Sequence, residues 1–279
     1  MSKPRHLISC RQPIALLECI AAHEQCSLRK GKTLLDERRV LVNGRRVWMA
    51  KHRLRPGDQV EILPATTSAA DPRASVLLET SDFLIVDKPP GILSNGPDSL
   101  ESLLRQQRRE DALRAVHRLD RDTSGCLCLA RRAGAEARAR RCFEAGGVVK
   151  LYQAIVHGCP AQREGTITHR IDGQPALTHW RVLAATDTAA CVQLKIDTGR
   201  THQIRKHLSS IGHPVLGDRQ YFTARLEDPR LRAVPRQMLH AASFQAPLGE
   251  RDAVLRVSAP LPADFKRTLR AFGLRPARP

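Results

Sequence analysis

The sequence predicts an α+β protein whose larger domain is built on a mixed or antiparallel sheet and is preceded by a small basic domain. Beyond residue 76, short apolar runs typical of strands follow one another with few helical stretches between them. The segment Pro64 to Arg73 is rich in small and turn-forming residues and interrupts the apolar pattern. We therefore expect a domain over 1–63, a linker over 64–75 and a second domain over 76–279.

In the small domain, helical patterns cover 14–22 and 33–39. The run 40–42 leads into Asn43-Gly44, which favours a hairpin because both residues tolerate a positive φ. A turn at 55–58 should then lead into a strand over 59–63.

The large domain should open with two paired strands, because apolar runs at 76–79 and 83–86 are separated by three turn-forming residues. The chain is expected to leave the sheet at 87–91. Further strands are expected at 126–130, 150–157, 178–185, 190–197, 238–246 and 253–258, and helices near 99–107, 134–144, 201–210 and 262–271.

The charge of the chain points to a polyanionic partner. Its 279 residues include 46 Lys+Arg and 28 Asp+Glu, for a net charge of +18. Such a surplus attracts nucleic acid, because each neutralised phosphate releases counterions. No segment approaches the roughly 18 apolar residues of a spanning helix, and the N-terminus lacks an apolar signal core. We expect no membrane association and a cytoplasmic location.

Motifs for cofactors and metals are missing from the sequence. Eight cysteines are scattered without a Cys-x-x-Cys pair, which favours reduced thiols over disulfides or a zinc site. Neither of the glycine-rich signatures for dinucleotides or nucleoside triphosphates is present. We therefore expect no cofactor and no metal.

A dense polar cluster extends from His117 to Gly125 and reads His-Arg-Leu-Asp-Arg-Asp-Thr-Ser-Gly. It precedes an expected strand, and loops at strand ends often carry reactive groups. Asp120 lies between Arg118 and Arg121, whose charges should favour its ionised form. An ionised carboxylate suits a nucleophile or a base better than a general acid.

A second cluster covers 198–208. Gly199 is expected to allow a tight turn and Thr201 to cap the helix that follows. The N-terminus of this helix together with Arg200 would form an anion site. His202 and His207 are five residues apart, which does not fit the helical zinc spacing and favours hydrogen-bonding or packing roles.

These clusters resemble the RluA-type pseudouridine synthases. The run from His117 to Gly125 matches the family signature, and the run from Gly199 to Arg205 matches its later arginine motif. Three further segments agree in the same order, namely Lys88-Pro89-Pro90-Gly91, Lys150-Leu151-Tyr152-Gln153-Ala154 and Leu239-His240-Ala241. The resemblance covers about 76–260.

The small domain resembles the αL-type RNA-binding domain that is shared with a small-subunit ribosomal protein. In that family, the second helix and the hairpin present basic residues to RNA. The resemblance implies phosphate contacts for Lys30, Lys32, Arg38, Arg39 and Arg45.

The resemblance also implies catalytic roles. Asp120 would be the essential aspartate, either a nucleophile at the anomeric carbon of the ribose or a base at the neighbouring carbon. Tyr152 would stack on the target base and assist removal of its proton. Arg205 would pair with Asp120 and hold the carboxylate in place.

Substrate contacts are implied as well. Arg118 resembles the arginine that fills the gap left by an extruded uridine, and Leu239 and His240 would line the pocket wall. The other expected substrate-binding residues are Arg121, Arg200 and His202.

The sequence thus predicts a monomeric isomerase that converts uridine to pseudouridine in structured RNA by base flipping. Large-subunit ribosomal RNA is the expected substrate and transfer RNA the alternative. A non-catalytic RNA-binding assembly factor is a second alternative, and a nuclease or glycosidase built on Asp120 and Asp122 is a weaker third.

Overall fold

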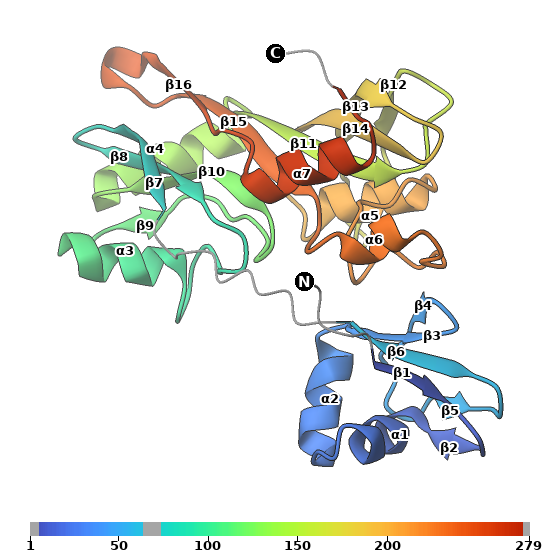
Figure 1. Ribbon diagram of the computed structural model, residues 1–279. Coiled ribbons are helices and arrows are strands. Elements are labelled where there is room, and N and C mark those ends of the chain that lie inside the picture. The colour runs from blue at the N-terminus through green and yellow to red at the C-terminus, as the bar shows by residue number, and fades with distance from the viewer. Residues whose placement is uncertain (1–5, 64–73, 276–279) are drawn as a thin grey trace. The chain divides into compact units, whose positions relative to one another are not determined.

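The computed structural model describes residues 6–63 and 74–275. They form two compact units, one containing 6–63 with 217–236 and the other 74–216 with 237–275 (Figure 1). The expected linker at 64–75 lies outside the described residues except for its last two positions. The domain boundaries at 1–63, 64–75 and 76–279 therefore stay a prediction.

The smaller unit contains an antiparallel sheet in the order β1-β6-β3-β4, a separate strand pair β2-β5, and three helices. Its elements are β1 (His6–Ser9), β2 (Ile14–Ala15), α1 (Leu16–His23), α2 (Leu28–Asp36), β3 (Val40–Val42), β4 (Arg45–Arg46), β5 (Arg53–Leu54), β6 (Gln59–Ile62) and α6 (Pro229–Ala233). Apolar residues from α1, α2 and the strands form one buried core.

The expected hairpin is present, since Asn43 and Gly44 adopt φ values of 50° and 78° between β3 and β4. The second helix begins earlier than its sequence pattern suggests. The hydroxyl of Ser27 accepts a hydrogen bond from the Lys30 amide, which starts α2 at Leu28.

Residues 217–236 pack against this hairpin region from a distant part of the sequence. The Arg225 side chain donates to the carbonyl of Asn43 at 2.8 Å, and Arg219 donates to that of Glu37 at 3.1 Å. Nothing in the local sequence pattern of this segment predicts the association.

The larger unit is an α+β domain on one ten-stranded sheet, as expected. The sheet order is β12-β13-β14-β11-β15-β10-β8-β7, with β9 beside β10 and β16 beside β15. Only the β10–β15 pair is parallel among the strand pairs of the described residues, so the sheet is mixed.

The strands are β7 (Ser75–Glu79), β8 (Phe83–Lys88), β9 (Arg114–Ala115), β10 (Ser124–Ala130), β11 (Val149–His157), β12 (Glu164–Ile167), β13 (Thr178–Ala185), β14 (Ala189–Ile196), β15 (Leu239–Pro247) and β16 (Val254–Ser258). The helices are α3 (Leu100–Arg108), α4 (Ala133–Glu144), α5 (Gln203–Ser210), the short η1 (Glu250–Asp252) and α7 (Ala263–Ala271). Strand β8 extends through Lys88, so the chain leaves the sheet later than expected.

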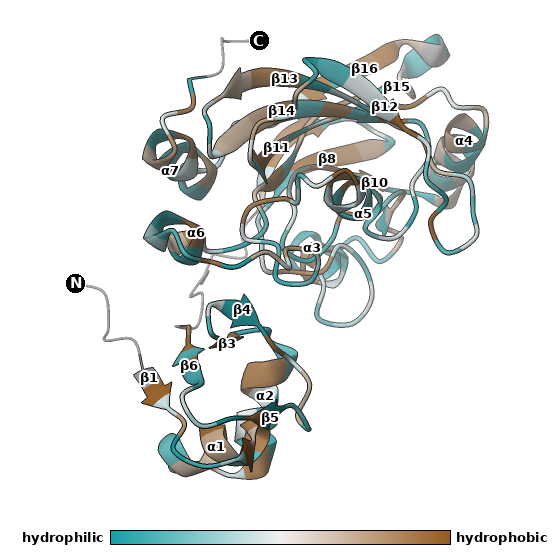
Figure 2. Cartoon of the chain, turned by 90° about the vertical axis from the view of Figure 1, so that its right-hand side faces the viewer, coloured by the Kyte–Doolittle hydropathy of each residue, from teal (hydrophilic) through white to brown (hydrophobic). Residues whose placement is uncertain are grey.

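The core of this unit supports the start of β10. Ala135 and Ala139 of α4 are buried against side chains of β8, β10 and β15. Every residue of β10 is buried, and hydrophobic colours extend along β8, β11 and β14 in Figure 2. A loop that ends at Ser124 is therefore anchored on a rigid, tightly packed strand.

Within the described ranges, no helix combines the length and the apolar character needed to span a bilayer.

Candidate active site

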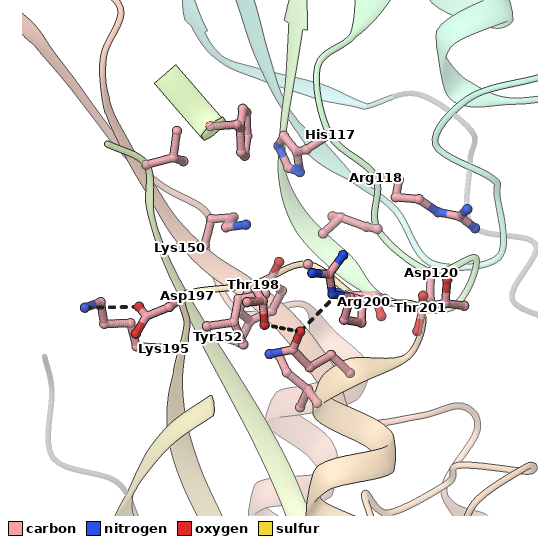
Figure 3. Close-up of a pocket in the computed structure, with 18 of the residues that line it drawn as sticks. His117, Arg118, Asp120, Lys150, Tyr152, Lys195, Asp197, Thr198, Arg200 and Thr201 are labelled. Carbon is pink, nitrogen blue, oxygen red and sulfur yellow. Dashed lines mark hydrogen bonds and ion pairs between the residues drawn. The ribbon is translucent and has the colours of Figure 1, made fainter. Parts of the chain in front are cut away.

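A cavity of about 970 Å³ opens where the loop before β10, strands β11 and β14 and the start of α5 come together (Figure 3). Its lining comes from four stretches of the larger unit, namely 116–123, 143–152, 195–205 and Leu239. Of the expected site residues, its lining includes Arg118, Asp120, Tyr152, Arg200, His202, Arg205 and Leu239.

Asp120 is held by Arg205 across 85 positions of sequence. Nη1 of Arg205 lies 3.1 Å from Oδ2 of Asp120, and Nε2 of His202 lies 3.9 Å from Oδ1. The arginine side chain is 8% exposed and the carboxylate 19%, so this ion pair is shielded but open to the cavity. The Nε of Arg121 instead donates to the carbonyl of Gly91 at 3.0 Å. The pairing implied for Arg205 is present, whereas the neighbouring Arg121 does not serve the carboxylate.

The loop that carries Asp120 is fixed by buried polar groups. Nζ of the fully buried Lys88 donates to the carbonyls of Pro89 at 2.9 Å and Arg121 at 3.0 Å. The Ser94 hydroxyl donates to the Leu119 carbonyl and accepts from the Leu119 amide, both at 2.9 Å. These bonds clamp the chain on either side of the carboxylate, which favours one fixed orientation.

Packing explains why threonine and glycine occupy positions 123 and 125 after Asp120. The hydroxyl of Thr123, buried in the protein, accepts a 2.8 Å hydrogen bond from the Gln237 side chain. Gly125 has a φ of 111°, and a Cβ at this position would overlap the carbonyl oxygen of Ala241. Glycine is required here because β10 and β15 approach each other so closely.

The structure corrects the prediction for His240. Leu239 lines the cavity, but His240 is fully buried and is absent from the cavity lining. Its Nδ1 lies 3.0 Å from the Ser124 hydroxyl, to which it is hydrogen-bonded. Successive residues of a strand point to opposite faces, so both could not line the same wall. His240 supports the start of β10 instead, and Arg121 is also outside the lining.

Tyr152 projects from β11 into the cavity and is 6% exposed. Burial, followed by the negative charge of Asp120, raises the pKa of Tyr152 above its ordinary value. The phenol is therefore neutral at neutral pH, and its ring is available for stacking.

The start of α5 differs from the expected one. His202, with a φ of 56°, occupies the N-cap position, and its side chain makes no capping bond. The expected Thr201 cap is absent, and no side chain caps α5. The Gln203 side chain instead holds the turn before the helix, because its Oε1 accepts from the Arg200 amide at 3.0 Å and from the Thr198 hydroxyl at 2.7 Å. The side-chain amide of Gln203 therefore fixes the conformation of this turn.

Gly199 and His207 of this segment were also given roles from the sequence. Gly199 does not adopt a left-handed backbone, so a positive φ is not what the turn requires of it. His207 is buried, with Nδ1 2.9 Å from the Thr178 hydroxyl and Nε2 2.9 Å from the carbonyl of His169. The hydrogen-bonding role expected for His207 is confirmed.

Several residues of the lining received no role from the sequence, among them His117 and Lys150. Nε2 of His117 accepts from the Cys128 amide at 3.1 Å, and its ring stacks on that of Phe244. Burial, followed by the positive charge of Lys150, lowers the pKa of His117 to about 3. The alternation of a strand could have found Lys150, since it is two residues before Tyr152 and so shares its face.

The basic residues of the smaller unit fall into two groups. Lys30, Lys32 and Arg45 are exposed. The Arg38 guanidinium lies 3.9 Å from the ring centre of the exposed Trp48, and Arg39 donates to a backbone carbonyl at 2.9 Å. The phosphate contacts of all five residues stay a prediction.

Among the residues that the structure describes, no three His, Cys, Asp or Glu side chains are grouped so as to hold a metal ion.

Comparison with known proteins identifies the larger unit. Residues 82–210, which include Asp120, Tyr152 and Arg205, match the family model described as RNA pseudouridylate synthase. An uncharacterized RNA pseudouridine synthase of Bacillus subtilis, YjbO, is 33% identical over 260 residues, which is 82% of this chain and 89% of the relative. Ribosomal large subunit pseudouridine synthase D of Haemophilus ducreyi is 29% identical over 278 residues, or 86% of this chain and 85% of the relative.

Solved structures agree with this result. Human RNA pseudouridylate synthase domain containing 4 matches with a TM-score of 0.61 and 27% identity, covering 72% of this chain and 94% of the human one. The expected α+β fold and the expected family of the larger unit are confirmed, whereas the αL-type resemblance of the small domain stays a prediction. This chain belongs to the RluA-type family of RNA pseudouridine synthases, which are isomerases that act on RNA.

Proposed function

We propose that this enzyme isomerises specific uridines of large-subunit ribosomal RNA, with Asp120 as the essential group and the target nucleotide flipped into the cavity. The observation that supports the chemistry is the Asp120–Arg205 ion pair, which faces the same cavity as Tyr152. The observation that supports the substrate is the similarity to a relative named for the large ribosomal subunit.

The reaction exchanges one bond of the ribose for another. The bond from the anomeric carbon to N1 of uracil breaks, and a bond from that carbon to C5 forms. A proton leaves C5, and N1 gains one, so atoms and electrons balance without a co-reactant. Asp120 acts either by attacking the anomeric carbon or by removing a proton from the neighbouring carbon, and Arg205 positions it for either step.

Base flipping makes these atoms reachable. A uridine stacked inside a helix cannot place its anomeric carbon beside a carboxylate within a protein cavity, and extruding it costs a few kcal/mol. The neutral ring of Tyr152 offers a face on which the freed base can stack. Arg118 is exposed and belongs to the cavity lining, so it is suited to fill the gap in the RNA stack.

RNA phosphates would supply the binding energy that offsets flipping. Arg200 and His202 line the cavity near Asp120 and are suited to contact the strand. In the smaller unit, the exposed Lys30, Lys32 and Arg45 are suited to hold a neighbouring RNA segment.

The test uses total RNA from cells that lack the gene, so that any natural target is present and unmodified. Wild-type protein should introduce pseudouridine at discrete positions of the large ribosomal RNA, mapped at nucleotide resolution. Asp120→Asn removes the charge without changing the size of the side chain and should abolish the product while RNA binding persists.

Asp172→Asn is the matched control, because this carboxylate is 72% exposed, pairs with Lys206 and is absent from the cavity lining. It should keep full activity. Retained activity in Asp120→Asn would refute the catalytic assignment, and modification confined to transfer RNA would refute the substrate. Identical RNA maps with and without the wild-type protein would favour a non-catalytic RNA-binding factor.

A further inference from the structure

The cavity contains an ammonium group to which the chemistry above assigns no task. Lys150 lies on β11 and lines the cavity (Figure 3). Its Nζ is 5.2 Å from the ring centre of Phe143, and within residues 6–63 and 74–275 it makes no hydrogen bond or ion pair. The negative charge of Asp197 attracts it, but that carboxylate is already paired with Lys195 at 3.3 Å and His179 at 2.9 Å.

Other shielded lysines of the larger unit have partners. Lys88 donates to two backbone carbonyls, and Lys206 pairs with Asp172 at 2.9 Å. Lys150 is half-buried, and burial lowers its pKa. A partly desolvated cation without a hydrogen-bond or ion-pair partner costs free energy in the unbound protein, which marks it as a candidate for ligand binding.

A second donor lies beside it. Because Nε2 of His117 accepts from a backbone amide, the proton of the neutral ring is on Nδ1, which can donate to a ligand. The charge of Lys150 is close enough to lower the pKa of His117, and Figure 3 shows both side chains facing the same opening. Together they offer two kinds of donor but a single positive charge, which suits a singly charged oxyanion.

We propose that Lys150, assisted by Nδ1 of His117, binds a backbone phosphodiester of the RNA strand immediately next to the flipped uridine. This inference rests on the proposed function. Lys150 and Tyr152 share one face of β11 and are separated by about 7 Å, so a base on Tyr152 places its flanking phosphate within reach of the ammonium. The cavity volume of about 970 Å³ exceeds the space that a single base requires.

The subsite would hold the RNA backbone in its rotated conformation and would leave Asp120 to act on the sugar. Loss of the ammonium should therefore weaken binding of target RNA more than it slows the reaction at saturating RNA. A charge-assisted contact of this kind corresponds to roughly a tenfold change in Kd.

The experiment measures binding of the shortest RNA fragment that wild-type enzyme modifies, with every protein carrying Asp120→Asn so that nothing reacts. Lys150→Met keeps the apolar stem and removes the charge. The control Lys266→Met removes the same charge from an exposed position on α7, outside the cavity lining. Thermal melting of each variant establishes that it is folded.

Two readouts test the phosphate contact. Lys150→Met should reduce the slope of log Kd against log salt by about 0.7, the value for one phosphate of a single strand. In a fragment with an uncharged methylphosphonate on one side of the target uridine, the protein with Lys150 should bind about tenfold more weakly, whereas Lys150→Met should lose nothing further. Lys150→Arg should restore the slope, and Lys266→Met should behave like its parent.

The inference is overturned if Lys150→Met binds like Lys266→Met, or if methylphosphonates on either side weaken both proteins equally. It is also overturned if Lys150→Met, made in a second set of proteins that keep Asp120, lowers the reaction rate at saturating RNA and leaves RNA Kd unchanged, since the lysine would then act on the reacting nucleoside. Failure of the proposed function gives a different result. If Asp120→Asn still forms pseudouridine in the mapping assay described above, the catalytic assignment of Asp120 is refuted, whatever effect Lys150→Met has on RNA binding.

Discussion

The His117 ring should make the larger unit sensitive to acid. Its pKa falls from 6.5 to about 3 because burial removes water from the ring and because Lys150 is nearby. Unfolding restores the ordinary value, so between these pH values the unfolded chain binds a proton that the folded chain does not. The stability contributed by this residue is therefore complete above the unfolded pKa and is lost as pH falls towards the folded pKa.

The size of the effect follows from the two pKa values. Lowering the pH from about 7.5 to about 5 should cost up to about 2 kcal/mol of unfolding free energy through this one ring. The loss depends almost entirely on the unfolded pKa of 6.5, because the folded ring is still neutral at the lower pH.

His117→Phe provides the comparison, because it cannot titrate and keeps a ring beside Phe244, 5.5 Å away between centroids. It also leaves the Cys128 amide without an acceptor, which costs about 1–3 kcal/mol at every pH and cancels in the difference. His157 and His207, whose pKa values burial also lowers, are present in both proteins.

The assay is urea unfolding at the two pH values. Unfolding is monitored through hydrogen–deuterium exchange of β10 peptides, so that the larger unit is observed by itself. Wild type should lose up to about 2 kcal/mol more than His117→Phe on acidification. An equal loss in the two proteins, or an NMR titration of His117 with a midpoint near its ordinary pKa, would refute the reasoning.

Three further predictions concern residues around the cavity. Gly125→Ala should destabilise the larger unit by more than about 3 kcal/mol in urea unfolding, because its Cβ would overlap the Ala241 carbonyl and its φ is 111°. Lys88→Met should lower kcat with little change in RNA Kd, because it releases the loop that carries Asp120; a change in Kd alone would contradict this. Tyr152→Phe should keep RNA binding. Wild type should lose stability above pH 10.0, because the raised pKa of Tyr152 favours folding only while the phenol is protonated. Melting curves at alkaline pH should show this loss in wild type and not in Tyr152→Phe.

The partners of Asp120 could be predicted only in part from the sequence. Charge alone suggested the neighbours Arg118 and Arg121, whereas resemblance to the family suggested Arg205. The structure places Arg205 on the carboxylate and turns Arg121 towards Gly91. Adjacent residues in an irregular loop have no fixed mutual direction, so proximity in sequence is a poor guide to which charges meet.

The N-cap of α5 was likewise not predictable from local sequence. Thr201 has the right chemistry and position for an N-cap, and local rules favour it. In the structure no side chain caps α5, and the Gln203 side chain instead ties the preceding turn to a neighbouring segment, because its Oε1 accepts from the Thr198 hydroxyl and its Nε2 donates to the carbonyl of Leu177. The competing partner comes from another part of the fold, and a local pattern cannot include it.

The sequence by itself determined the features that depend on a few neighbouring residues. The strand runs, the Asn43-Gly44 turn and the motif loop all follow from side-chain alternation, backbone sterics and short spacings, which act within one segment. Tertiary structure alone decided that β10 lies parallel to β15, that His240 supports Ser124, and that the described residues offer the Lys150 ammonium no ion-pair partner. These features depend on which distant segments share the limited space around one sheet, because packing and desolvation act through space and not along the chain.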